Sequence, residues 1–264
     1  MLLTAIAILL SLAAAGETKI AANEPGVAVD LELVLAVDVS GSMDLEEAQV
    51  QRAGYVEALM HPDFLAAIRE GYHGRIAISY YEWGGTIAKN SQLPWSVIET
   101  DDDAVGFAQL IQKRPFTSLR GTSLSTAIAF GSGLFDDNRY AGTRRVIDIS
   151  GDGPNNYGAP VTPARDAATA LGIIINGLAI MIRPSASHGP LDQYYGDCVI
   201  GGPGAFVISV QKPEDFATAI RRKLVLEVSG NQPPARLLPA ASHADCLIGE
   251  KLRPGLEPYP ELNR

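Results

Sequence analysis

Three short polar segments carry oxygen-bearing side chains at spacings suited to holding a hard metal ion. The first, 38–42, is Asp-Val-Ser-Gly-Ser, which presents one carboxylate and two hydroxyls to the same side of an extended backbone. The second is Gly-Thr-Ser at 121–123, and the third is Ser-Gly-Asp-Gly at 150–153. Oxygen ligands without His or Cys favour Mg²⁺, Mn²⁺ or Ca²⁺ over zinc or copper. The candidate ligands are Asp38, Ser40, Ser42, Thr122 and Asp152.

The elements around these segments alternate between strand-like and helix-like patterns. Alternation with apolar strands predicts an α/β fold: a doubly wound, mostly parallel sheet with helices on both faces and one antiparallel edge strand. Ligands bind such sheets at the carboxyl ends of the strands, where segments 38–42 and 150–153 fall. We expect strands at 31–37, 75–83, 145–150, 173–180 and 205–209, an antiparallel partner ending near 98, and helices at 44–60, 101–112, 123–135, 163–171 and 213–226.

Several polar residues near these segments have structural as well as functional interpretations. Asp152 alone suits an ordinary Asp-Gly turn, and Thr122 alone suits a helix N-cap. Asp148 lies within a predicted central strand, either supporting the metal ligands or forming an ion pair with Arg144 or Arg145.

Further candidates lie on the predicted loops. Trp83 could join a recognition rim or pack in the core, and Asn155-Asn156-Tyr157 could line the site or form a turn. The acidic run 101–103 is typical of a helix start, with a calcium site as the alternative. Segment 201–204 lacks the Lys-Ser/Thr of a phosphate-binding loop and predicts a turn.

Composition narrows the function classes. The chain has 264 residues, of which 47% are hydrophobic, and a formal net charge of −9, so nucleic acid is not an expected partner. The four histidines are scattered without ligand spacing, which argues against a zinc role. Cys198 and Cys246 could form one disulfide in an oxidising compartment, or remain two buried thiols.

The ends of the chain differ in composition from its centre. The apolar run 2–15, followed by Gly16, predicts a signal peptide over 1–15, and a buried or anchoring helix is the alternative. No stretch reaches the length of a membrane-spanning helix, so we expect an exported protein, periplasmic or secreted, without a stable membrane span. The remaining boundaries that we expect are a linker at 16–30, one domain at 31–228 and a Pro-rich, extended C-terminal tail at 229–264.

The order Asp-x-Ser-x-Ser, Gly-Thr, then an apolar strand closed by Asp-Gly resembles the von Willebrand factor type A (vWA) domain with its metal-ion-dependent adhesion site. More narrowly, segments 146–153 and 198–206 resemble an uncharacterised family of exported bacterial proteins that carry this domain. The resemblance implies that Ser40 and Ser42 ligate the ion directly and that Thr122 does so directly or through water. It implies that Asp38 and Asp152 act directly or through bridging waters.

The same resemblance implies a function. The ion, Mg²⁺ by first expectation because its octahedral shell tolerates retained waters, would capture an Asp or Glu of a protein partner at its open position. In some relatives the last helix, here 213–226, shifts on ligation. We therefore expect a binding module and not an enzyme, with no catalytic residue assigned. The alternatives are a metal-dependent hydrolase or phosphoryl-transfer enzyme with Asp38 as nucleophile, and a structural domain with an unused site.

Overall fold

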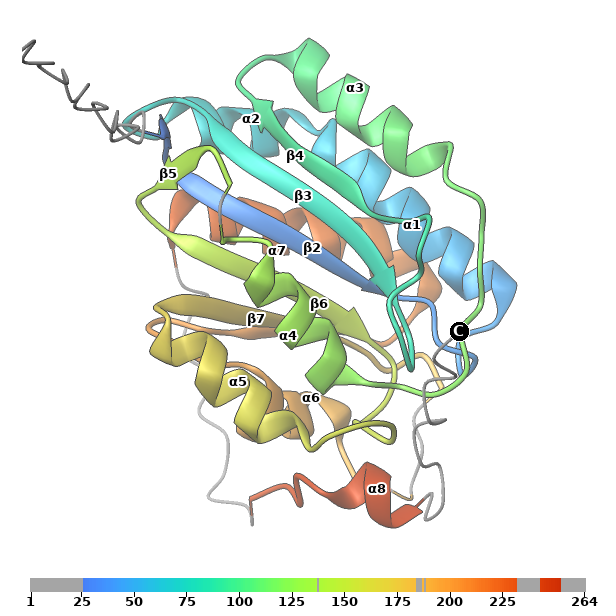
Figure 1. The fold of residues 1–264 in the computed structure, drawn as a ribbon. Helices are drawn as coiled ribbons and strands as arrows, with labels where there is room; N and C mark the ends of the chain where they lie inside the picture. The colour runs from blue at the N-terminus through green and yellow to red at the C-terminus, as the bar shows by residue number, and fades with distance from the viewer. Residues whose placement is uncertain (1–25, 137, 184–186, 188, 232–242, 253–264) are drawn as a thin grey trace, which may run out of the picture.

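The computed structural model describes residues 26–136, 138–183, 187, 189–231 and 243–252 (Figure 1). The predicted signal peptide at 1–15 lies outside these residues, as do most of the predicted linker and much of the tail. None of the helices in the described part of the chain has the length and apolar character needed to cross a membrane.

A six-stranded sheet with the order β4-β3-β2-β6-β7-β8 forms the centre of the molecule. All neighbouring strands are parallel except β3 and β4, which form the antiparallel edge, so the predicted fold class is confirmed. Strand order reverses beside β2, because the chain moves outward to β3 and β4 and then returns to β6 on the other side. The strands are β2 (Leu31–Asp38), β3 (Ile76–Trp83), β4 (Leu93–Ile98), β6 (Arg145–Gly151), β7 (Ile173–Ile180) and β8 (Val207–Val210).

Helices cover both faces of the sheet (Figure 1). Strand β2 shows why both faces are apolar: Leu33 and Leu35 pack on one side, while Val34 and Ala36 pack on the other. One layer contains α1 (Leu45–Leu59), α2 (Pro62–Arg69), α3 (Asp101–Gln112) and α7 (Phe216–Ser229). The other contains α4 (Leu124–Gly133), α5 (Val161–Ala170) and α6 (Leu191–Tyr194) with the π-helical turn Tyr195–Val199.

Helix boundaries follow local capping chemistry. Asp44 caps α1 in a reciprocal capping box with Glu47, and Thr100 caps α3 in the same way with Asp103. The acidic run 101–103 therefore forms the start of a helix, as predicted, although the N-cap itself is Thr100.

Short elements depart from the sequence prediction. Helix α2 was not expected, because a single proline-initiated helix of two turns gives little periodic signal. Strand β1 (Val27–Val29) lies within the predicted linker and pairs with β5 (Tyr140–Gly142), while α8 (Ile248–Leu252) lies within the tail that was predicted to be extended. The predicted helix 213–226 begins as a 3₁₀ turn (Pro213–Asp215), and α7 then runs on to Ser229.

Asp148 forms a buried ion pair, but with a different partner from either arginine proposed from the sequence. Lys223 Nζ of α7 lies 2.8 Å from Asp148 Oδ2, and both side chains are fully buried. Arg144 instead donates to the carbonyl oxygens of Glu227 and Val228, at 2.7 Å each. Lys223 reaches Asp148 because α7 packs across the centre of β6, whereas Arg144 and Arg145 lie at the start of that strand.

The two cysteines form a disulfide between Cys198 and Cys246, with their Cα atoms 5.4 Å apart. This confirms the disulfide prediction and excludes the alternative of two buried thiols. The bond joins the π-helical turn after α6 to the segment that leads into α8.

Candidate metal centre

The first and third polar segments meet because their strands are neighbours. In the register of β2 and β6, Val37 lies opposite Ser150, so Asp38 and Asp152 leave the sheet side by side. The second segment reaches the same edge through the main chain: Gly41 N donates to Leu119 O at 2.7 Å, and Leu119 N donates to Val39 O at 3.0 Å. All three segments therefore lie at the carboxyl end of the central strands, beside the point where strand order reverses.

Four of the five candidate ligands form one hydrogen-bonded group. Ser40 Oγ lies 2.9 Å from Ser42 Oγ, and Ser42 Oγ donates to Asp152 Oδ1 at 2.7 Å. The Asp38 carboxylate accepts from Ser40 N at 2.6 Å and from Asp152 N at 3.4 Å. The side-chain oxygens of Ser40, Ser42 and Asp152 thus form a hydrogen-bonded chain, and the Asp38 carboxylate joins it through the main-chain nitrogens of Ser40 and Asp152.

Thr122 lies beside this group, in the wall of the same cleft as Ser42 and Asp152. Its side chain is buried, and its main chain is held by Asn156: Thr122 N donates to Asn156 Oδ1 at 3.0 Å, and Asn156 N donates to Thr122 O at 2.8 Å. Gly121 precedes it with φ +79°, a conformation that glycine adopts without strain. Asn156 therefore lines the site, as one of the two interpretations of 155–157 proposed.

Asn155 has a structural role in the same loop. It is fully buried, and its Oδ1 accepts from Ser125 N at 3.1 Å, near the start of α4. Asn156 therefore lines the site, whereas Asn155 stabilises the loop.

The electrostatics of the site favour a cation. Asp38 is completely buried, and burial together with the nearby Asp152 raises its pKa well above the ordinary value, against hydrogen bonds from Ser40 that lower it. Burial also raises the pKa of Asp152, while Ser42 lowers it. A buried carboxylate and a partly buried one beside it repel each other, and a divalent ion bound by these residues would offset that penalty.

The donor set fits a hard divalent ion. Two carboxylates and three hydroxyls supply oxygen ligands only, which suits Mg²⁺ and does not suit a soft metal. Among the described residues, no group of three or more His, Cys, Asp or Glu side chains is placed to hold a metal, so any centre here depends on the hydroxyls. The hydroxyl of Tyr195 is buried near both carboxylates without a hydrogen-bond partner in the described structure, so polar capacity remains beside Asp38.

Gly151 allows the close approach of these groups. A Cβ at this position would lie 2.5 Å from Tyr195 Oη and 2.9 Å from Asp38 Oδ2. Any side chain there would displace the carboxylate or the phenol.

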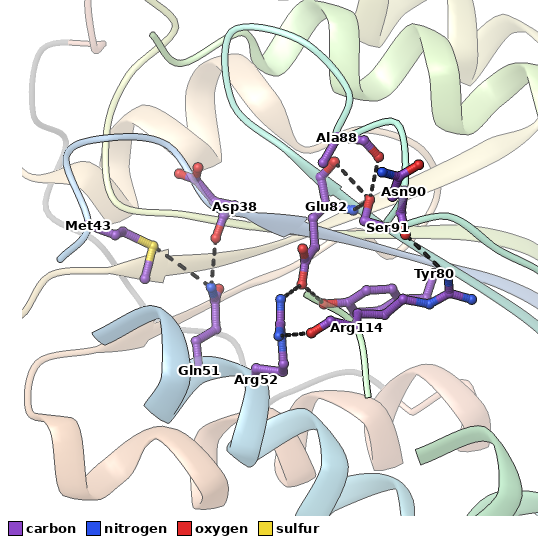
Figure 2. Close-up of polar contacts among 10 residues, drawn as sticks. All are labelled: Asp38, Met43, Gln51, Arg52, Tyr80, Glu82, Ala88, Asn90, Ser91 and Arg114. Carbon is purple, nitrogen blue, oxygen red and sulfur yellow. Dashed lines mark hydrogen bonds and ion pairs between the residues drawn. The ribbon is translucent and has the colours of Figure 1, made fainter. Parts of the chain in front are cut away.

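A residue of α1 fixes the main chain of the first polar segment. Figure 2 shows Gln51 reaching from α1 to the main chain of Asp38, where its Nε2 donates to the carbonyl oxygen at 2.8 Å. Sequence reasoning missed Gln51, although its helical spacing from the buried Ala48 and Tyr55 places a polar side chain on the apolar stripe of α1.

A second buried group lies under the end of β3. Glu82 Oε1 accepts from Arg52 at 2.5 Å and from the Tyr80 hydroxyl at 2.7 Å (Figure 2). The neighbouring Trp83 is fully buried in the core, so the proposed recognition rim at this residue is wrong and its core interpretation is confirmed. Its side chain packs within the core layer that contains α4 and α5, which accounts for this burial.

Solved structures with the same fold carry adhesion and matrix functions. Proximal thread matrix protein 1 from the mussel byssus superposes with a TM-score of 0.54 at 14% identity, over 77% of this chain and 49% of that chain. The pilus adhesin SpaC from Lactobacillus rhamnosus GG gives 0.56 at 11% identity, over 76% and 30%. The vWF domain of the pilus tip protein Mfa5 from Porphyromonas gingivalis gives 0.54 at 11% identity, over 80% and 99%.

These likenesses establish a vWA fold. This chain spans half or less of the length of the mussel protein and of SpaC. No curated protein sequence matches it. The profile of a family described as "Protein of unknown function (DUF1194)" matches residues 28–232, which is most of the chain. The chain is therefore a member of the DUF1194 family, and its fold is that of a vWA domain.

Proposed function

We propose that this protein is an interaction module that binds one divalent cation through Asp38, Ser40, Ser42, Thr122 and Asp152 and captures an acidic residue of a protein partner through that ion. The observation that carries the proposal is the buried carboxylate of Asp38 beside the partly buried carboxylate of Asp152, joined by hydrogen bonds to Ser40 and Ser42 next to a cleft that Ser42 and Asp152 line. When bound, the ion supplies an open coordination position and positive charge for an incoming carboxylate.

We propose for the chain's own residues the roles that the vWA resemblance implies. Ser40 and Ser42 are the direct ligands; neutral hydroxyls leave the ion's charge only partly compensated and so keep it attractive to a further carboxylate. Asp38 and Asp152 balance the charge, and Thr122 is the ligand that can exchange with water. Mg²⁺ is the ion that we propose, with Mn²⁺ and Ca²⁺ as alternatives.

Two proteins that share only the fold with this chain support this proposal. One structure of the mussel protein is described as having a zinc-occupied MIDAS motif, with a TM-score of 0.53 at 14% identity. SpaC is described as a pilus adhesin. We further propose that the chain is exported to the periplasm or the medium, which its disulfide supports because such bonds persist in oxidising compartments.

A binding role fits the site better than hydrolysis. In the described part of the chain, no Lys or His side chain forms a hydrogen bond or an ion pair with Asp38 or Asp152 that could serve as a proton donor to a leaving group. We therefore propose no catalytic step.

Isothermal titration of chelator-treated protein with Mg²⁺, Mn²⁺ and Ca²⁺ tests the metal centre. We expect one site per chain, weakened at least about tenfold in Asp38→Ala because a charged ligand is lost. Asp102→Ala, which removes an exposed carboxylate at the start of α3, is the matched control and should bind like the wild type. Equal binding by the wild type and Asp38→Ala would refute the assignment.

Partner capture needs a separate test. We expect immobilised peptides that contain Asp or Glu to retain the protein in Mg²⁺, and the same peptides with Asn or Gln to fail, because only a carboxylate completes the ion's shell with charge. Retention that persists in EDTA would show that binding does not use the metal.

A further inference from the structure

Tyr195 places a phenol hydroxyl at the edge of the sheet where the metal ligands gather. Its side chain is completely buried, and among the residues that the structure describes none forms a hydrogen bond with its Oη. A buried hydroxyl without a partner destabilises a fold, whereas a phenyl ring of the same shape carries no such penalty. Packing alone therefore accounts for the ring of Tyr195 but not for its hydroxyl.

The hydroxyl lies next to the Asp38 carboxylate. A Cβ on Gly151 would lie 2.5 Å from Tyr195 Oη and 2.9 Å from Asp38 Oδ2, so both oxygens are within 2.9 Å of one point. The two carboxylate oxygens differ in their contacts: Oδ1 accepts from Ser40 N at 2.6 Å, whereas Oδ2 accepts from Asp152 N at the longer distance of 3.4 Å. Because a carboxylate oxygen has two lone pairs, Oδ2 can accept a further hydrogen bond, and Oη has a donor to give.

Two strand glycines provide the space for the ring. Gly151 lies on β6 and Gly177 on the neighbouring β7, and a Cβ on Gly177 would lie 2.7 Å from Tyr195 Cδ1. Neither glycine has a positive φ, so the backbone conformation does not require glycine at either position. A glycine inside a strand weakens it and often marks a close approach by another group. These two glycines therefore allow Tyr195 to reach the level of Asp38.

The turn that carries Tyr195 is held in place. Tyr195 begins the π-helical turn, in which Ile200 N donates to Tyr195 O at 2.9 Å. Cys198 lies in the same turn and is bonded to Cys246. Single π-helical turns are rare and are frequent at functional sites. The phenol is thus presented by an irregular turn that a covalent bond anchors.

The adjacent tyrosine connects this turn to the cleft. Tyr194 Oη accepts from Asn155 N at 3.1 Å, so its hydroxyl, unlike that of the next residue, has a partner. Asn155 Nδ2 donates to Glu250 Oε1 of α8 at 2.8 Å, and α8 lines the cleft of the metal centre through Gly249 and Leu252. The π-helical turn, the loop after β6 and α8 therefore form one connected support for the site.

We propose that Tyr195 is a positioning residue of the metal centre, whose hydroxyl donates a hydrogen bond to the Asp38 carboxylate when the cation is bound. This proposal rests on the proposed function, because it requires Asp38 to hold the cation. The hydrogen bond fixes the orientation of the carboxylate and stabilises its charge, as the partners of metal-ligating carboxylates do. Tyr195 thus acts through Asp38 and is not itself a ligand.

Titration calorimetry with Mg²⁺ tests the proposal on the wild type, Tyr195→Phe and the matched control Tyr81→Phe. Tyr81 is also fully buried, but its hydroxyl donates to Ala127 O at 2.6 Å. We expect Tyr195→Phe to bind Mg²⁺ about tenfold more weakly, since losing a hydrogen-bond partner of a ligand typically weakens metal binding by that factor or more. Tyr81→Phe should bind like the wild type.

The outcomes separate this proposal from the metal centre itself. Unchanged affinity in Tyr195→Phe would overturn the role of Tyr195 and leave the metal centre standing. Equal weakening in both variants would also overturn it, because the effect would then come from packing. Failure of the wild type to bind Mg²⁺ would refute the metal centre, and the proposal with it.

Thermal unfolding in EDTA distinguishes positioning from structural support. Tyr195→Phe removes a hydroxyl that has no partner among the described residues, so we expect its melting temperature not to fall below that of the wild type. Tyr81→Phe leaves Ala127 O without its donor and should melt at a lower temperature. A fall in Tyr195→Phe as large as that in Tyr81→Phe would show that the hydroxyl supports the fold, and would overturn the proposal.

Ultraviolet difference spectroscopy reports the hydrogen bond directly. A phenol that becomes a hydrogen-bond donor to a carboxylate absorbs at longer wavelength, so adding Mg²⁺ should shift the tyrosine band of the wild type and of Tyr81→Phe. We expect this shift to be lost in Tyr195→Phe. A shift of full size in Tyr195→Phe, or none in a wild type that binds Mg²⁺, would contradict the proposed contact.

Discussion

At Asp38, burial and a neighbouring carboxylate act in the same direction. Both destabilise the ionised side chain, and both raise its pKa. The hydrogen bonds from Ser40 N and Asp152 N compensate only part of this cost. An ionised Asp38 therefore lowers the stability of the metal-free fold. The same charge would provide binding energy for a cation, which is typical of a functional site.

Removing the charge of Asp38 should therefore have opposite effects with and without metal. We expect Asp38→Asn to raise the melting temperature of metal-free protein by a few degrees, since about 1 kcal/mol corresponds to roughly 2–4 °C in a domain of this size. Adding Mg²⁺ should stabilise the wild type and leave the variant unchanged, because the variant loses a charged ligand. Thermal unfolding in EDTA and in Mg²⁺ measures both effects, and a Mg²⁺ shift of equal size in the variant would contradict the assignment.

At the scale of elements, a buried charge cluster joins α7 to the centre of the sheet. Lys223 pairs with Asp148 of β6 at 2.8 Å and with Glu227 one helical turn away at 2.5 Å. Tyr55 of α1 donates to Asp148 at 3.2 Å, and Asn176 of β7 donates to Glu227 at 3.1 Å. The contact between Lys223 and Asp148 therefore ties α7, the last helix of the domain, to the centre of the sheet.

Truncating the cation of this cluster should destabilise the whole domain. Lys223→Met leaves Asp148 buried without its counter-ion and Glu227 without its hydrogen-bond donor, and we expect it to lower the free energy of unfolding by about 3–5 kcal/mol. Lys89→Met, at an exposed turn, removes the same charge without burial and should change stability by less than about 0.5 kcal/mol. Urea denaturation of both variants measures the difference, and similar values would show that the buried pair does not stabilise the fold.

The same cluster predicts how stability varies with pH. Burial and Asp148 raise the pKa of Glu227 to about 8 from an ordinary value of 4.5, against the lowering effects of Lys223 and Asn176. The folded state thus binds the proton more tightly than the unfolded state, so this stabilisation is complete below the ordinary value and is lost as the pH rises through about 8. We expect Glu227→Gln to lose less stability than the wild type between about pH 5 and about pH 9 in urea denaturation. Parallel pH profiles for the two proteins would show that Glu227 does not titrate in this range.

At the scale of the whole molecule, the strand order brings the site together and the disulfide closes it. The loops after β2 and β6 separate at the point where strand order reverses, and this leaves room for a cleft between them. The covalent bond between Cys198 and Cys246 then holds α8 against the cleft, although 48 residues separate the two cysteines. The core is therefore held by packing between the sheet and its helices, whereas the cleft wall formed by α8 also depends on the disulfide.

Removing the disulfide should affect the cleft wall more than the core. In Cys198→Ser with Cys246→Ser, we expect backbone amide exchange to rise at least about tenfold in Ile248–Leu252 and to remain unchanged in β2 and β6, because those strands are held by two packed helical layers. The upper limit for the loss of global stability is about 4 kcal/mol, the loop-closure value for a loop of this length. Hydrogen exchange with mass spectrometry resolves the two regions, and equally faster exchange in the core strands would refute this separation.

The sequence alone predicted the fold class and most of the long elements, because each carries a local signal. Strand β7 and helix α3 have the predicted boundaries. The signal for β7 is an apolar run between turns and that for α3 is an acidic, capped start, and each signal spans only a few neighbouring residues. The five candidate ligands were also named from local spacing, and the structure links four of them in one hydrogen-bonded group, with Thr122 in the wall of the cleft that Ser42 and Asp152 line. Their role as metal ligands remains a prediction.

Only the tertiary structure decided which distant residues meet. The pairing of Asp148 with Lys223, the burial of Trp83 and the docking of α8 on Asn155 depend on packing between segments far apart in the chain, and no local pattern encodes them. Short elements such as β1 and α8 were missed for the same physical reason: so few residues cannot form a stable strand or helix alone, and they exist because a neighbouring surface stabilises them.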